Sequence, residues 1–165
     1  VWDSLAITEY LAERHPGVWP ADPVARAFAR SAAAEMHAGF QALRSECSMS
    51  VGVRVRLQAP SPGLAADLGR LEALWGDGLA NFGGPWLAGA RFTAADAFFA
   101  PVAFRAQTYG LALGSVAADY VDRLLALPAM QDWYAAGIAE TVRDAPHDAG
   151  IAAVGTVTAD VRATV

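Results

Sequence analysis

The stretch that predicts the fold is residues 92–110, with the sequence FTAADAFFAPVAFRAQTYG. Thr93 and Asp96 form a capping box in which Asp replaces the usual Glu or Gln. The Thr93 hydroxyl can accept a hydrogen bond from the Asp96 N–H, and the Asp96 carboxylate can accept one from the Thr93 N–H. Phe92 can pack on the first turn as a hydrophobic staple. The sequence therefore predicts a helix whose structural N-cap is made by Thr93 and Asp96.

The helix that follows this cap is apolar on all sides, which is typical of a buried helix. Pro101 removes one backbone hydrogen bond within it and predicts a kink. Gly110 is a natural stop. Because a helix that is apolar all round must be covered by other helices, we expect an all-α fold.

Apolar residues at helical spacing predict further helices on both sides of this stretch. We expect them at residues 3–15, 23–47, 64–82, 115–127 and from 128 onward. Residues 48–63 contain glycine and prolines and predict a loop or a broken helix end. The corresponding domains are a remnant at 1–15, a linker at 16–23, an all-α domain at 24–143 and a mobile tail at 144–165.

The composition excludes several classes of protein. Hydrophobic residues make up 55% and charged residues 18% of the 165 residues, which argues against disorder. The net charge is −5 and the 12 basic residues are all Arg without a basic run, so we expect no nucleic-acid partner. No apolar run is long enough to predict a membrane span. Cys47 is the single cysteine, which excludes an intrachain disulfide and fits a cytoplasmic location.

Three motifs occur in an order and spacing that resemble a known family. They are WDSLAITEYL at residues 2–11, FGGPWLAG at 82–89 leading to FTAAD at 92–96, and LPAMQDW at 127–133. Together they resemble the glutathione S-transferase family, bacterial type, from residue 2 to about residue 141. The first resembles the segment that closes the family's thioredoxin-like domain, and the others resemble its C-terminal helical domain.

The resemblance implies a glutathione transferase C-terminal helical bundle. A remnant of a thioredoxin-like α/β domain, namely its last strand edge and helix, would precede it. The Ser, Tyr or Cys that activates the glutathione thiol in the family, and its cis-proline loop, have no counterpart in this chain. We therefore expect no catalytic residue here and no activity of the chain alone. Glutathione is the implied co-substrate, a hydrophobic electrophile the other partner, and the full-length protein a homodimer.

Asp3 and Ser4 are the predicted glutathione-binding residues. The N-terminus of a helix suits a carboxylate, Ser4 adds a hydroxyl donor, and Asp3 can bind an ammonium group. The γ-glutamyl end of glutathione carries both of these groups on one carbon. The alternative is that Asp3 or Ser4 only caps the helix.

The resemblance also implies a substrate pocket that includes Met36, His37, Phe40 and Arg105. From the residues alone, Met36 and Phe40 belong to the core, and His37 lies beside the apolar stripe as a surface, packed or pocket residue. A buried Arg105 favours a structural ion pair with a carboxylate over a substrate contact. No metal site is predicted, because the histidines lack nearby ligands in the sequence.

The predicted function is conjugation of the glutathione thiolate to a hydrophobic electrophile. An alternative is a non-catalytic helical module of the same fold, used for binding or assembly. A ligand-binding domain of a regulator is a third possibility, but the sequence has no helix-turn-helix motif or basic patch to support it.

Overall fold

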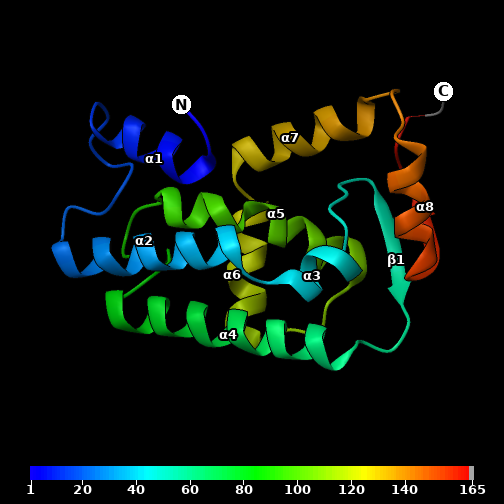
Figure 1. The fold of residues 1–165 in the computed structure, drawn as a ribbon, viewed down its shortest axis with the longest axis horizontal. Helices are drawn as coiled ribbons and strands as arrows, with labels where there is room; N and C mark the ends of the chain where they lie inside the picture. The colour runs from blue at the N-terminus through cyan, green and yellow to red at the C-terminus, as the bar shows by residue number, and fades with distance from the viewer. Residues whose placement is uncertain (164–165) are drawn as a thin grey trace. The chain divides into compact units, whose positions relative to one another are not determined.

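The computed structural model describes residues 1–163 and is mainly helical (Figure 1). Its elements are α1 (Ser4–Ala12), α2 (Pro23–Ala38), α3 (Gln41–Glu46), β1 (Val53–Leu57), α4 (Pro62–Phe82), α5 (Ala94–Tyr109), α6 (Ser115–Leu125), α7 (Pro128–Ala139), α8 (Ala145–Ala153) and β2 (Gly155–Asp160). The helical class predicted from the sequence is therefore confirmed. None of the helices in this part of the chain combines the length and the hydropathy needed to cross a membrane.

The chain forms two compact units, each built from two segments. Unit 1 comprises Val1–Phe40 and Arg70–Phe99, and unit 2 comprises Gln41–Gly69 and Ala100–Val165. Helices α4 and α5 contribute to both units. The predicted domain boundaries at residues 15, 23 and 143 remain predictions.

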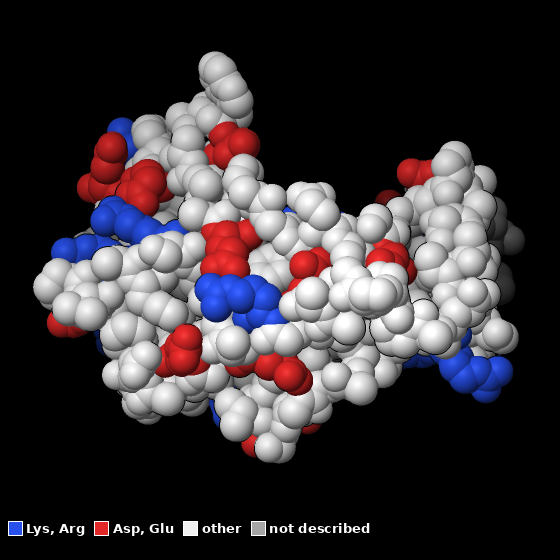
Figure 2. Space-filling model, turned by 60° about the horizontal axis from the view of Figure 1, so that its bottom comes forward, with Lys and Arg blue, Asp and Glu red and all other residues white. Residues whose placement is uncertain are grey.

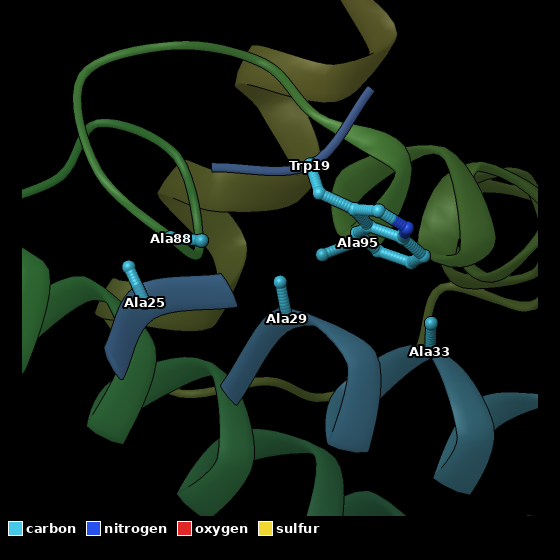
Figure 3. Packing of buried hydrophobic residues seen from close by; sticks show 6 residues of the cluster. All are labelled: Trp19, Ala25, Ala29, Ala33, Ala88 and Ala95. Atoms are coloured by element: carbon cyan, nitrogen blue, oxygen red, sulfur yellow. The ribbon is translucent and has the colours of Figure 1, made fainter. Parts of the chain in front are cut away.

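The core of unit 1 is built largely from small side chains. Its buried cluster consists of Trp19, Ala25, Ala29, Ala33, Ala88 and Ala95. Ala25, Ala29 and Ala33 recur every four residues along α2, and their side chains project from one side of it toward Trp19 and Ala88 (Figure 3). Methyl groups at these positions let the linker and the loop before α5 approach the helix closely.

Asp96 ties together the loop and the start of α5, and its side chain is fully buried. One carboxylate oxygen accepts from the Thr93 N–H at 2.8 Å and from the Thr93 hydroxyl at 3.3 Å. The other accepts from the Leu87 N–H at 3.0 Å. The predicted bond from Thr93 N–H to Asp96 is confirmed, whereas the contact with Leu87 lies outside the predicted capping box.

The helix expected over residues 23–47 is interrupted. Asp22 accepts from the Ala25 N–H at 2.8 Å and starts α2 with Pro23 in its first turn, as capping rules predict. The helix ends at Ala38, followed by Gly39 in an extended conformation and Phe40 at a φ of 58°. A Cβ at Gly39 would lie 2.8 Å from the Glu35 carbonyl oxygen, so this exit requires glycine.

Helix α5 is continuous through Pro101. Its second half, which belongs to unit 2, donates hydrogen bonds to the backbone of the segment that follows α3. The Thr108 hydroxyl donates to the Ser50 carbonyl oxygen at 2.6 Å. The Tyr109 hydroxyl donates to the Ser48 carbonyl oxygen at 2.9 Å. These polar side chains on an otherwise apolar helix satisfy backbone oxygens that have no strand or helix partner.

The C-terminal segment differs from the mobile tail expected at 144–165, since it contains α8 and β2. Asp144 accepts from the His147 N–H at 3.1 Å and caps α8, and Ile151 is buried. Strand β2 pairs antiparallel with β1, from Val53 opposite Asp160 to Leu57 opposite Gly155. The expected loop at 48–63 was therefore also wrong over the residues of β1. The alternation of apolar and charged residues over Val53–Leu57 is typical of a strand and was overlooked, whereas its partner strand, about a hundred residues further along the chain, could not be predicted from it.

Replacing Asp96 by Ala should lower the free energy of unfolding by about 3 kcal/mol, because two buried N–H groups lose their acceptor. Denaturant unfolding followed by circular dichroism measures the change. Asp119→Ala, which removes an exposed carboxylate, is the matched control and should change stability by less than about 0.5 kcal/mol. Equal stabilities of the two variants would contradict the role assigned to Asp96.

Candidate functional site

Asp3, Ser4 and His37 come together at the N-terminus of α1. The Ser4 Oγ lies 3.1 Å from His37 Nδ1, and the Asp3 Oδ2 lies 3.3 Å from His37 Nε2. His37 is in the last turn of α2, 33 residues further along the chain. One imidazole ring thus contacts both predicted glutathione-binding residues through its two nitrogens.

The alternative role of Asp3 as a capping side chain is not what the structure shows. Asp3 occupies the N-cap position of α1, but its side chain makes no capping hydrogen bond. Its carboxylate lies beside His37 instead, with 63% of the Asp3 side chain and 33% of the His37 side chain exposed. The pair is therefore accessible to a ligand in solution.

The chemistry of this cluster suits a ligand with both a negative and a positive group. The start of α1 carries a partial positive charge and N–H groups that the Asp3 side chain does not cap. Asp3 adds a carboxylate and Ser4 a hydroxyl that can donate or accept. The His37 ring can donate from Nε2 to the Asp3 carboxylate and accept from the Ser4 hydroxyl at Nδ1, and when both nitrogens carry a proton it donates to both residues.

Met36 and Phe40 belong to the core of unit 1, with exposed fractions of only 4% and 6%. Burial of both agrees with the interpretation from the residues alone, in which they form part of an apolar stripe. In their present positions neither side chain offers a surface to a substrate. His37 differs from both, because it faces solvent beside Asp3.

Arg105 in unit 2 does not form the expected ion pair. Its Nη1 donates to the backbone carbonyl oxygen of Cys47, and no carboxylate lies within ion-pair distance of it among residues 1–163. Burial lowers the pKa of the Arg105 guanidinium, and the neighbouring Arg44 lowers it further. The guanidinium nevertheless stays charged at neutral pH, because its ordinary pKa is far above 7. A carbonyl oxygen therefore takes the place that the prediction gave to a carboxylate.

Cys47 and Tyr109 lie close to Arg105 and share its buried surroundings. Burial raises the pKa of the Cys47 thiol to about 11, although the charge of Arg105 acts in the opposite direction. Burial likewise raises the pKa of Tyr109 to about 12. Both groups are therefore neutral at physiological pH, and Cys47 is not a nucleophile here.

The charge distribution gives no support to other kinds of site. Among residues 1–163 no group of three or more His, Cys, Asp or Glu side chains could hold a metal ion. On the face drawn in Figure 2, basic and acidic side chains lie in small mixed groups among uncharged residues. A continuous basic surface for nucleic acid is not present on that face.

The contact of His37 with Asp3 and Ser4 was not predicted from the sequence. The only signal was that His37 lies off the apolar stripe of its helix, which shows that it faces away from the core but not what it meets. Which residue it meets depends on how α1 packs against α2, where Arg30 also binds Glu9 with two hydrogen bonds of 2.8 Å.

The Cys47 thiol should react slowly with a disulfide reagent such as dithionitrobenzoate in the native protein. At pH 8, a pKa near 11 leaves on the order of a hundredfold less thiolate than an exposed cysteine has. The labelling rate should rise with pH toward about 11 in the native protein, and toward the ordinary thiol pKa in guanidinium chloride. Equal rates at pH 8 in native and denatured samples would contradict the burial of Cys47.

Comparisons with known proteins address the family. Residues 61–136 match the family model described as glutathione S-transferase, C-terminal domain. A solved structure of a glutathione transferase homologue from Burkholderia gl BGR1, with bound glutathione, is 24% identical and has a TM-score of 0.58. The match covers 83% of this chain and 67% of the homologue. No curated protein matches this chain. Residues 61–136 therefore resemble the C-terminal domain of the glutathione S-transferase family, and the solved homologue shares the helical fold of this chain.

Proposed function

We propose that this chain is the helical part of a glutathione transferase and that Asp3 and Ser4 bind the γ-glutamyl end of glutathione. The observation that carries the proposal is the contact of both residues with His37 at the open N-terminus of α1. This contact holds a carboxylate and a hydroxyl side by side in solvent. The bound glutathione in the structurally similar homologue supports the choice of ligand.

Each group of the γ-glutamyl end has a partner in this proposal. Its carboxylate binds at the N-terminus of α1, where the first-turn N–H groups and the Ser4 hydroxyl donate to it. Its ammonium group binds the Asp3 carboxylate through a charge-assisted hydrogen bond. His37 positions both side chains. When both imidazole nitrogens carry a proton, the ring donates to Asp3 and to Ser4 Oγ, and the Ser4 hydroxyl is available to donate to the ligand.

The reaction proposed for the full-length protein is attack of the glutathione thiolate on a hydrophobic electrophile. The group that lowers the pKa of the thiol lies outside these 165 residues in this proposal, and this chain supplies binding and orientation. We assign Met36 and Phe40 a supporting role beneath the electrophile rather than direct contact, since both are buried. Arg105 supports the segment after α3 through the Cys47 carbonyl.

A cytoplasmic homodimer is the proposed working state of the full-length protein. Four large apolar side chains at this end of the chain are exposed, one just before α1 and three in it: Trp2, Ile7, Tyr10 and Leu11. Such a group of exposed apolar side chains is typical of a surface that is covered in the complete protein.

Replacing Ser4 by Ala in the full-length gene product should weaken glutathione binding by about tenfold, which corresponds to the loss of one hydrogen bond to a charged group. Isothermal titration calorimetry measures the affinity. Ser115→Ala at the exposed start of α6 is the matched control and should bind like the unaltered protein. His37→Gln should have a smaller effect than Ser4→Ala because it acts through Ser4 and Asp3. Unchanged affinity of the Ser4 variant would refute the assignment of this site.

The 165-residue chain by itself should not accelerate conjugation of glutathione with chlorodinitrobenzene above the uncatalysed rate. The reason is that no residue of this chain is assigned to lower the pKa of the thiol. The absorbance of the conjugate measures the rate, with the full-length protein as the comparison. Turnover by the chain alone would show that a thiol-activating group lies within it. A full-length protein that binds glutathione without turnover would favour the non-catalytic module.

A further inference from the structure

His37 joins Asp3 and Ser4 through the two nitrogens of one ring. Its Nε2 lies 3.3 Å from the Asp3 carboxylate, and its Nδ1 lies 3.1 Å from the Ser4 hydroxyl oxygen. Because 33% of the His37 side chain is exposed, the ring can exchange protons with solvent. Histidine is the residue type whose charge ordinarily changes near neutral pH. The hydrogen bonds of this cluster therefore depend on how many protons the ring carries.

In the neutral ring, the proton belongs on the nitrogen that faces Asp3. A carboxylate oxygen can only accept, so Nε2 must donate to it. Nδ1 then has a lone pair and accepts a hydrogen bond from the Ser4 hydroxyl. A hydroxyl has one proton, and that proton is used by the ring. With the neutral ring, Ser4 therefore presents only oxygen lone pairs to a ligand carboxylate, which itself has no proton to donate.

A second proton on the ring reverses its hydrogen bond with Ser4. Both nitrogens then donate, Nε2 to Asp3 and Nδ1 to the Ser4 Oγ. The Ser4 hydroxyl proton is released from the ring and can be donated to the ligand carboxylate. The Asp3 carboxylate has two oxygens, so in both states it can accept from the ring and from the ligand ammonium together. The two protonation states thus differ in what Ser4 offers to the ligand.

The charges of the ligand do not oppose this effect. The γ-glutamyl end carries a carboxylate and an ammonium group on one carbon, so its net charge is zero. Attraction of a charged ring to the carboxylate and repulsion from the ammonium act over similar distances and largely cancel. The hydrogen bond at Ser4 therefore decides which protonation state of the ring binds the ligand more tightly.

Two other carboxylates on the helices that meet at His37 are held by arginines. Glu35 in α2 accepts two hydrogen bonds from Arg70 of α4, at 2.6 and 2.8 Å. Glu9 in α1 accepts two from Arg30, both at 2.8 Å. These hydrogen bonds lower the pKa of each carboxyl group. Both groups therefore stay charged over the pH range in which histidines titrate.

We infer that His37 couples glutathione binding to the uptake of a proton, as a positioning residue that frees the Ser4 hydroxyl for the γ-glutamyl carboxylate when both ring nitrogens are protonated. By reciprocity, the bound ligand favours the protonated ring to the same extent. This inference rests on the proposed function of Asp3 and Ser4, and it adds that the site binds more tightly as the pH falls. Protonation of Asp3 would have the opposite effect, since it weakens the contact with the ligand ammonium.

Titration of the full-length protein with S-methylglutathione between about pH 5.5 and 7 tests this inference. The methylated sulfur removes the titration of the thiol, and the carboxylates and the amine of the ligand keep their charges over this range. Affinity should rise several-fold as the pH falls, and at most about tenfold, which is the effect assigned to the Ser4 hydrogen bond. Calorimetry in two buffers of different ionisation enthalpy should show a net uptake of protons on binding.

His37→Gln should make the affinity independent of pH, because the amide can donate to Ser4 but does not titrate. Ser4→Ala should also remove the dependence, since the coupling passes through its hydroxyl. His15→Gln is the matched control and should keep the full dependence, because His15 is an exposed histidine beyond the other end of α1.

An unchanged pH dependence in His37→Gln would overturn the inference and leave the proposed glutathione site intact. Binding to the unaltered protein without proton uptake would do the same, and that measurement does not depend on the folding of any variant. Unchanged affinity in Ser4→Ala would instead refute the site itself, and the inference with it.

Discussion

The buried carboxylate of Asp96 is the constraint on which unit 1 depends. It accepts hydrogen bonds from the N–H groups of Leu87 and Thr93, and thereby fixes the loop that leads into α5. Ala94, the first residue of α5, donates its N–H to the carbonyl oxygen of Val18 at 2.9 Å. The loop and the linker are therefore both attached to the first turn of α5. Trp19 follows directly after Val18 and fills the core against the alanines of α2.

A similar principle organises unit 2, although other residues provide it. A segment without regular structure follows α3, and its carbonyl oxygens need donors because part of it is buried. Arg105, Thr108 and Tyr109 supply these donors from one helix. These three polar side chains of an otherwise apolar α5 thus bind backbone carbonyl oxygens. This explains why a charged side chain is present in a buried helix that has no catalytic assignment.

The two ends of α1 differ in their chemistry. The N-terminal end brings an acidic residue, a hydroxyl and an imidazole together in solvent, whereas the C-terminal end faces a cavity lined by arginines. Both ends depend on α2, which supplies His37 to one and Arg26 and Arg30 to the other. The packing of α1 against α2 therefore controls the geometry at both ends, and an ion pair between Glu9 and Arg30 joins the two helices at the surface.

The sequence by itself determined the helical class, the start of α5 at Thr93 and Asp96, the start of α2 at Pro23, and the resemblance to the glutathione S-transferase family. These features depend on residues close together in the chain, where capping and helical spacing act. Tertiary structure alone decided that β1 pairs with β2, that Arg105 binds a carbonyl oxygen, and that His37 contacts Asp3 and Ser4. Each of these joins residues more than thirty positions apart, and local patterns carry no information about such partners. The end of α2 at Ala38 depends on both local sequence and tertiary structure. Gly39 is visible in the sequence, but the need for glycine there arises from the Glu35 carbonyl, against which a Cβ would collide.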